Sequence, residues 1–290
     1  MTDSIHIIYF SGTGGTALAA KTLAASIAGA KAGVSEIFRD DNPKIEQGEM
    51  LVLMYPVYAA DAPVPVFKWI DSLEKREGSK AAVISVSGGG EISPNTACRV
   101  KAIRRLERKG FIVTGEYMLC MPSNFIAPTD DDLAASLINI LPKKCKAIAD
   151  EIAVEKTNRK KPLLIDRIML IFFALEKFGA KFFEKLLKAD GSCNGCGLCA
   201  AKCPRANIKM DKGRPKFGWK CAICMRCIYS CPQKSIYARL PILKKAVFAQ
   251  GFDLDSIIKR AQKAPQGQSI TKDQGYLFKG VEEYIIQDSV

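Results

Sequence analysis

The chain has 290 residues, of which 48% are hydrophobic and 25% are charged. This balance is that of a folded protein of about two domains, and it excludes a disordered or low-complexity chain. No apolar run reaches the roughly 18–20 residues that a membrane-spanning helix needs, and no signal peptide is recognisable at the N-terminus, so the sequence predicts a cytoplasmic protein. Eleven cysteines in such a chain favour metal ligation over a disulfide scaffold.

Charge and cysteine are both unevenly distributed. Residues 1–155 hold 17 Lys and Arg against 19 Asp and Glu, whereas residues 156–290 hold 26 against 11. Eight cysteines fall between Cys193 and Cys231. We therefore expect two chemically different modules, joined at a basic stretch, residues 156–162. The remaining cysteines share no motif and are expected to be buried structural thiols: Cys98, Cys120 and Cys145.

Strand and helix signals alternate in the first half. Short apolar runs predict strands at Ile5–Phe10, Val34–Phe38, Met50–Tyr55, Ala81–Val86 and Phe111–Met121. Helical spacing of apolar residues predicts helices at Thr16–Ala30, Val64–Leu73, 95–109 and Asp130–Val154. The alternation indicates an α/β fold with a doubly wound, parallel, five-stranded sheet. Such sheets bind ligands beyond the carboxyl ends of their strands.

A glycine-rich loop, Ser11–Thr16, follows the first strand and opens a helix. Its glycines let the backbone turn tightly around an anion, and the amides of the helix N-terminus favour negative charge. The loop has neither the Lys of a Walker A motif nor the glycine spacing of the dinucleotide fingerprint. A tight strand–helix turn without a ligand is the alternative interpretation.

The pattern Ser-Gly-Thr-Gly-x-Thr resembles the phosphate loop of flavodoxins, which bind FMN without a cationic side chain. Where flavodoxins usually have Asn, this chain has Gly15. Three further loops agree with the resemblance: Tyr55–Tyr58, Ser87–Gly90 and Met121–Phe125. The resemblance covers residues 4–150 and implies a flavodoxin-like fold with an FMN site.

By that resemblance, the FMN-binding residues are Ser11, Gly12, Thr13, Gly14, Gly15, Thr16, Pro56, Tyr58, Ser87, Gly88, Gly89, Asn124 and Phe125. An aromatic ring at Tyr58 would lie over the isoalloxazine ring, and the amides of Ser87–Gly89 would reach its polar edge. Packing at a strand end is the alternative for Tyr58, and packing in the core is the alternative for Phe125.

The second half carries a cysteine motif twice. Cys-x2-Cys-x2-Cys-x3-Cys-Pro begins at Cys193 and again at Cys221, with an offset of 28 residues at every cysteine. A zinc ribbon is disfavoured, because zinc ribbons use paired Cys-x2-Cys motifs and do not need the third and fourth cysteines or the Pro found in both runs. The motif resembles that of bacterial ferredoxins with two [4Fe–4S] clusters, in which the fourth cysteine of each run ligates the other run's cluster. By that resemblance, one cluster is held by Cys193, Cys196, Cys199 and Cys231, and the other by Cys203, Cys221, Cys224 and Cys227.

The two cluster loops differ in their small residues. Gly195 and Gly197 leave the first loop's backbone free to approach its cluster. The second loop has Ala222 and Met225 near the equivalent places, with Ile223 and Ile228 as apolar cover. Hydrogen bonds from the backbone to sulfur influence cluster potentials. The asymmetry therefore predicts unequal potentials for the two clusters.

The cysteine-rich module is basic, with 10 Lys and Arg against 2 Asp and Glu in residues 190–240. Two oxidised clusters with their thiolates would contribute about −4, which leaves the module near +4. Three interpretations remain open: steering of acidic redox partners, contact with an anionic membrane surface, or a solvated basic surface. Nucleic acid is not an expected partner, because the basic residues lack interleaved aromatic residues.

The sequence thus predicts a flavodoxin-like domain at residues 1–155 and a two-cluster ferredoxin domain at residues 190–240. Residues 156–189 form a basic linker and an amphipathic helix, Leu163–Lys188, expected to pack between the domains or to contact a second copy or a membrane. Residues 241–290 form an extension with helix and strand fragments, which we expect to cover part of the ferredoxin domain. The arrangement resembles the flavodoxin–ferredoxin fusion proteins of anaerobes.

Three functions are consistent with this organisation. The first is electron carriage between FMN, two [4Fe–4S] clusters and external redox partners, and it is favoured because the sequence has no recognisable catalytic acid, base or nucleophile constellation. The second is an FMN-dependent reductase of a small acceptor, fed by the clusters, which an open cavity over the flavin would favour. The third is a redox sensor whose partner binding changes with cluster state.

Overall fold

The computed structural model describes residues 4–39, 42–172, 187–247, 251–263 and 278–286. Its first half is built on a parallel sheet with the strand order β2-β1-β3-β4-β5. The strands are β1 (Ser4–Tyr9), β2 (Lys31–Glu36), β3 (Met50–Pro56), β4 (Lys80–Ser87) and β5 (Ile112–Cys120). This is the flavodoxin-like order, and it confirms the predicted doubly wound α/β fold.

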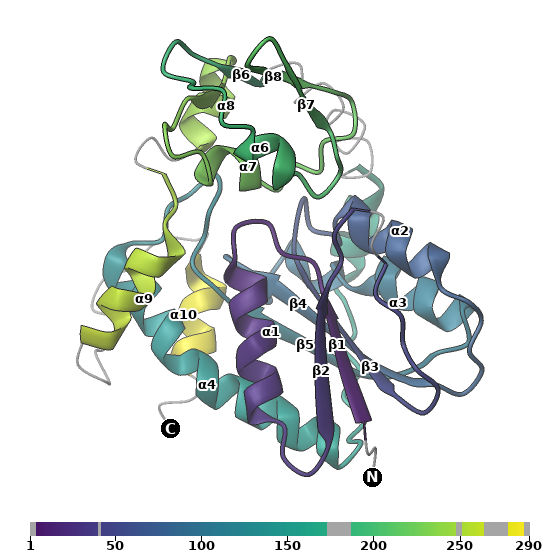
Figure 1. Cartoon of the computed structure of the whole chain (residues 1–290). Coiled ribbons are helices and arrows are strands. Elements are labelled where there is room, and N and C mark those ends of the chain that lie inside the picture. Colours follow the sequence, from purple (N-terminus) through teal and green to yellow (C-terminus); the bar gives the residue numbers. More distant parts are fainter. Residues whose placement is uncertain (1–3, 40–41, 173–186, 248–250, 264–277, 287–290) are drawn as a thin grey trace.

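Helices cover both faces of the sheet (Figure 1). Helices α1 (Gly15–Ser26) and α4 (Asp131–Ala153) lie on one face, and α2 (Val64–Ser72) and α3 (Val100–Arg108) lie on the other. The helix predicted over 95–109 is divided into a 3-10 turn, η1 (Asn95–Ala97), and α3. Strands β3 and β4 are buried on both faces, which explains their continuous apolar sequences.

The basic linker is docked against the edge of the sheet. Asn158 bridges to Gly115 in the edge strand β5, donating its amide to the Thr114 carbonyl and accepting from the Glu116 amide at 2.8 Å. This pairing covers an otherwise open sheet edge. Farther along, the fully buried Asp166 accepts hydrogen bonds from the Ser93 hydroxyl at 2.6 Å and from the Thr96 amide at 3.2 Å. The linker therefore follows a fixed path toward the carboxyl end of the sheet.

The predicted helix Leu163–Lys188 is only partly tested. Residues 164–172 are helical, residues 173–186 lie outside the described part of the chain, and Leu187–Ala189 forms a strand, β6, so the predicted C-terminal end is wrong. Of the alternatives for its apolar side, packing between the domains is not observed within 164–172, and contact with a second copy or a membrane is not tested. The helix turns Asp166 and Leu170 inward and leaves these side chains exposed: Leu164, Ile168, Ile171 and Phe172. The hydrogen bonds of Asp166 set this orientation.

The cysteine-rich module is small and lies above the carboxyl end of the sheet (Figure 1). Strand β6 pairs with β9 (Ile236–Ala238), and β7 (Ile208–Asp211) pairs with β8 (Arg214–Phe217) in a hairpin. Each cysteine run ends in a single helical turn. These turns are α6 (Leu198–Ala201) and α7 (Arg226–Tyr229).

The C-terminal extension packs mainly on the sheet domain. Helix α8 (Pro241–Ala246) contacts β9 of the cysteine-rich module, whereas α9 (Leu254–Lys263) and α10 (Lys279–Ile286) pack against α4. The expectation that the extension covers the ferredoxin module therefore holds for α8 alone among the described helices. In the part of the chain that the structure describes, no helix is both long and apolar enough to cross a bilayer.

Candidate cofactor sites

A cavity of about 540 Å³ lies at the carboxyl end of the sheet. The loops after β1, β3, β4 and β5 form its walls, as expected for a doubly wound sheet. Of the thirteen residues assigned to FMN by resemblance, twelve line it: Ser11, Gly12, Thr13, Gly15, Thr16, Pro56, Tyr58, Ser87, Gly88, Gly89, Asn124 and Phe125. The exception, Gly14, lines a neighbouring cavity on the other side of the loop.

The side chain of Ser11 fixes the conformation of the loop Ser11–Thr16. The Ser11 hydroxyl accepts hydrogen bonds from the amides of Gly14 and Ala17, at 3.2 and 3.3 Å. Gly14 has a φ of +101°, a backbone conformation that favours glycine. Helix α1 begins at Gly15, so first-turn amides lie at the cavity wall without intrahelical partners. The arrangement fits an anionic group such as a phosphate.

Tyr58 connects this loop to the cysteine-rich module. A Cβ atom at Gly12 would lie 2.3 Å from the Tyr58 hydroxyl and 2.5 Å from the Cys224 carbonyl oxygen, so only glycine fits there. The Tyr58 hydroxyl is buried and has no hydrogen-bond partner among the described residues. Burial, and then the neighbouring Cys224, raise the pKa of Tyr58 well above its ordinary value, so the phenol stays neutral. Such an orphaned polar atom in a cavity wall is consistent with a ligand that supplies its partner.

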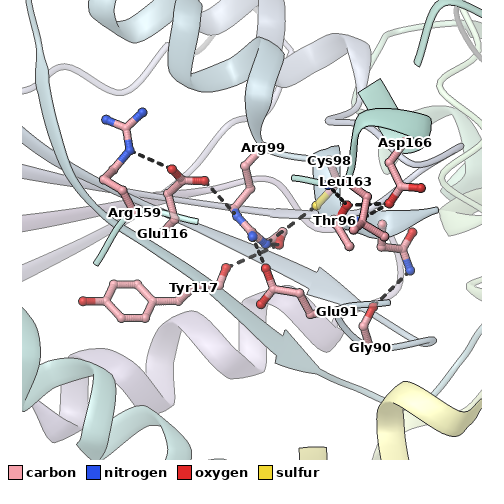
Figure 2. A network of polar contacts seen from close by, with 12 residues as sticks. Gly90, Glu91, Thr96, Cys98, Arg99, Glu116, Tyr117, Arg159, Leu163 and Asp166 are labelled. Atoms are coloured by element: carbon pink, nitrogen blue, oxygen red, sulfur yellow. Dashed lines mark hydrogen bonds and ion pairs between the residues drawn. The ribbon is translucent and has the colours of Figure 1, made fainter. Parts of the chain in front are cut away.

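A buried ionic network supports the loop after β4 (Figure 2). Arg99 is 1% exposed, donates to the Ser85 hydroxyl at 2.8 Å, and pairs with Glu91 and Glu116. Glu91 directly follows the glycine run that lines the cavity. The Asn95 side chain donates to the Ser87 hydroxyl at 3.2 Å, which also fixes this loop. The network thus positions the backbone at one wall of the cavity.

The cavity has walls that sequence analysis did not assign to it. Cys221, Ala222 and Ile223 of the second cysteine run close one side, and Phe252 and Phe278 of the C-terminal extension add aromatic surface. The two aromatic residues carry no sequence motif. The three residues of the cysteine run belong to a recognised motif, but their place depends on how the modules dock.

The structure brings together four cysteines from the two runs in one group. Cys203, Cys221, Cys224 and Cys227 line a single small cavity inside the module. Burial raises the pKa of the Cys227 thiol well above its ordinary value, and the neighbouring Cys224, Cys221 and Cys203 raise it further. Four thiols around one small cavity need a bound cationic group to exist together as thiolates. The donor set therefore fits an iron–sulfur cluster, with Cys203 crossing over from the first run.

The complementary group contains Cys193, Cys199 and Cys231. Burial raises the pKa of the Cys199 thiol, and Cys231 and Cys193 are the cysteines that raise it further. Burial alone would raise the pKa of Cys231, but hydrogen bonds from Ser235 and nearby amides lower it, which favours the thiolate. The remaining predicted ligand, Cys196, is exposed at the surface. Within the described residues, no three His, Cys, Asp or Glu side chains form a group suited to one metal ion.

The scattered cysteines behave as predicted. All three are buried, and burial raises the pKa of Cys98 to about 11 and that of Cys145 to about 12. Burial also raises the pKa of Cys120. These residues are neutral structural thiols at pH 7.

Two arginines join the module to the sheet domain. Arg226 of α7 donates from Nε to the Gly12 carbonyl at 3.1 Å, and from Nη2 to the Ser11 carbonyl and Glu36. Arg39, which follows β2, donates from Nη2 to the Ala200 carbonyl at 2.8 Å at the end of α6. The loop Ser11–Thr16 is therefore fixed at its C-terminal end by helix α1 and at its Ser11 and Gly12 carbonyls by Arg226.

Replacing Arg226 with Ala is expected to lower the free energy of unfolding by about 2–3 kcal/mol, because hydrogen bonds of a charged donor to three acceptors are lost. Arg226→Lys keeps the pair with Glu36 but cannot hold both carbonyls, so about half that loss is expected. Chemical denaturation of both variants measures the difference. Equal stability of Arg226→Ala and the native chain would show that this contact does not hold the modules together.

Comparisons with known proteins find similar sequences or structures for two parts of the chain. The family model of the 4Fe-4S dicluster domain matches residues 185–232. Among solved structures, similar chains are an archaeal flavodoxin (15% identity, TM-score 0.38), a Streptococcus pneumonia TIGR4 flavodoxin (15%, 0.40) and the oxidised Flavodoxin 2 of Bacillus cereus (17%, 0.39). Each covers 52% of this chain and 97–99% of its own. No curated protein matches the sequence.

The chain thus combines a flavodoxin-like sheet domain, defined by its strand order, with a 4Fe–4S dicluster domain, defined by the family match. The zinc alternative for the cysteine runs is accordingly not retained.

Proposed function

We propose that the protein transfers electrons between a bound FMN, two [4Fe–4S] clusters and external redox partners. One observation carries this proposal: a single cavity is lined both by the four sheet loops expected to hold FMN and by Cys221 of the cysteine-rich module. A flavin in that cavity would lie against a cluster ligand. FMN exchanges two electrons and a cluster exchanges one, so their contact couples two-electron to one-electron chemistry.

The chain's own residues supply the binding groups. The amides and hydroxyls of Ser11–Thr16 would hold the phosphate, and Tyr58 and Phe125 would form walls beside the ring system. Asn124 donates to the Thr13 hydroxyl, which ties the loop after β5 to the phosphate loop. When bound, FMN supplies the two-electron redox chemistry. Covalent linkage of the two modules keeps donor and acceptor at a high effective concentration for each other.

Anaerobic reductive titration tests this function. The protein loaded with FMN and both clusters is expected to take up about four electrons, two by the flavin and one by each cluster, with flavin and cluster absorption changing together. An uptake of about two electrons, with no flavin absorption even after FMN is added, would contradict the flavin half of the proposal. Rapid reoxidation by a small acceptor but not by a redox protein would favour the reductase alternative.

A further inference from the structure

The two cluster loops share a positive φ at two matched positions but have different residues there. Gly195 and Gly197 of the first loop have a φ of +74° each, and their counterparts 28 residues later, Ile223 and Met225, have φ values of +52° and +58°. Positive φ is accessible to glycine but unfavourable for a β-branched residue such as isoleucine. The second loop therefore keeps a strained residue where the first loop has none.

The strained side chain has a specific location. Ile223 lines both the large cavity at the carboxyl end of the sheet and the small cavity surrounded by Cys203, Cys221, Cys224 and Cys227. Cys221 and Ala222 line both cavities as well, and Ile223 is the largest apolar side chain of the three. Backbone strain that persists in a folded protein clusters at functional sites. An apolar partition excludes water from the contact between a cluster and a ligand of the large cavity.

The other cysteine group does not line the large cavity. Cys196 is exposed, and a Cβ atom at Gly195 would lie 2.8 Å from the Gly213 carbonyl, so the first loop packs against the turn of the β7–β8 hairpin. That hairpin is basic and exposed. Its exposed cationic residues are Lys209, Lys212, Arg214 and Lys216. Lys216 pairs with Asp211, the hairpin's acidic residue.

We propose, on the basis of the proposed function, that the two clusters have different roles. The cluster of Cys203, Cys221, Cys224 and Cys227 exchanges electrons with the flavin across Ile223. The cluster of Cys193, Cys196, Cys199 and Cys231 exchanges them with an acidic, one-electron redox protein that docks on the β7–β8 hairpin. Basic residues around an exposed cluster steer such a partner.

The electron balance of this path is simple. In the direction of flavin reduction, the partner protein would be oxidised by one electron and the hairpin-side cluster would be reduced, and that cluster would then reduce the flavin-side cluster. The flavin-side cluster returns to its oxidised state by passing the electron to FMN. Two such passages reduce FMN by two electrons, and the accompanying protons come from solvent.

Two sets of variants separate the two roles. Ile223→Gly makes the second loop like the first and relieves strain, so the chain is expected to fold and to keep both clusters. Loss of an apolar wall is expected to raise the dissociation constant of FMN about tenfold, which flavin fluorescence measures. Flash reduction is expected to show slower equilibration between flavin and clusters. Reduction by an acidic two-cluster ferredoxin should keep its rate.

The reciprocal result is expected for the hairpin. Lys209→Glu combined with Lys212→Glu should slow reduction by the acidic ferredoxin and weaken its dependence on salt, while FMN affinity and internal equilibration stay unchanged. Lys21→Glu combined with Lys44→Glu, on α1 and on the loop between β2 and β3, is the charge-matched control and should change neither. Reversed effects, with the hairpin variant altering internal equilibration and Ile223→Gly altering only external reduction, would overturn the assignment. Absence of bound FMN in the native protein would instead refute the proposed function.

Discussion

Replacing Arg99 with Met is expected to lower the free energy of unfolding by about 3–5 kcal/mol, the usual cost of removing one partner from a buried ion pair. Arg99 is 1% exposed and holds Glu91 and Glu116, while its Nη1 donates to Ser85 at 2.8 Å. Methionine fills a similar volume, so the loss reflects the carboxylates left without their cation rather than an empty space.

Arg159 provides a matched control for this prediction. It pairs with the same Glu116, at 2.7 Å, but its side chain is 41% exposed. Arg159→Met is therefore expected to cost about 1 kcal/mol or less, because solvent screens the pair. Denaturant titration of the two variants measures both values. Equal losses would mean that burial does not decide the strength of this network.

Arg99→Met also tests the link between the network and the cavity. Glu91 is the residue that follows the glycine run Gly88–Gly90 in the loop after β4 (Figure 2). Release of Glu91 should let that loop move and weaken FMN binding, whereas Arg159→Met should not. The dissociation constant of FMN is measured without denaturant, where both variants are fully folded. A difference between the variants then reflects the loop rather than a loss of global stability.

Strands β3 and β4 could be predicted because burial on both faces produces continuous apolar runs, whereas β2 (Lys31–Glu36), which has no buried residue, begins three residues before the predicted Val34–Phe38 and ends two residues before it does. Met50–Tyr55 and Ala81–Val86 are observed as β3 (Met50–Pro56) and β4 (Lys80–Ser87). The helix at 164–172 could not be placed correctly, because its orientation depends on Asp166, whose partners Ser93 and Thr96 lie about 70 positions away in the sequence. Hydrophobic periodicity assumes that apolar residues face inward, and a buried carboxylate with fixed partners overrides that assumption.

The loops that line the cavity could be predicted from the topology, because the carboxyl ends of parallel strands lie at one edge of the sheet. The part of the cavity wall formed by Ile223, Phe252 and Phe278 could not be predicted from the sequence. Its residues come from segments that reach the cavity only after the modules dock, and docking leaves no local periodicity. The one available signal was the asymmetry between the two cysteine runs, where Ile223 replaces the glycine found at position 195.

Single Cys→Ser variants are expected to fall into two groups, and each group contains cysteines from both runs. Cys203→Ser should remove the same cluster as Cys221→Ser, because Cys203 lines one cavity with Cys221, Cys224 and Cys227. Cys231→Ser should remove the same cluster as Cys193→Ser, because neither residue lines that cavity and the ferredoxin-type motif assigns both to the other cluster. In each variant the iron content should fall from about eight to about four atoms per chain.

The identity of the surviving cluster decides the grouping. Its reduction potential and its EPR spectrum should be shared by Cys203→Ser and Cys221→Ser, and a second, different pair of values should be shared by Cys231→Ser and Cys193→Ser. Only the group that keeps the Cys221 cluster should retain rapid exchange with the flavin, because Cys221 lines the flavin cavity. Grouping by run, with Cys203→Ser matching Cys193→Ser, would show that each run holds its own cluster and that the crossed arrangement is wrong. Loss of all iron in every single variant would also agree with crossed ligands, because each run would then contribute to both clusters. In that case the variants would be compared by their spectra after reconstitution with iron and sulfide.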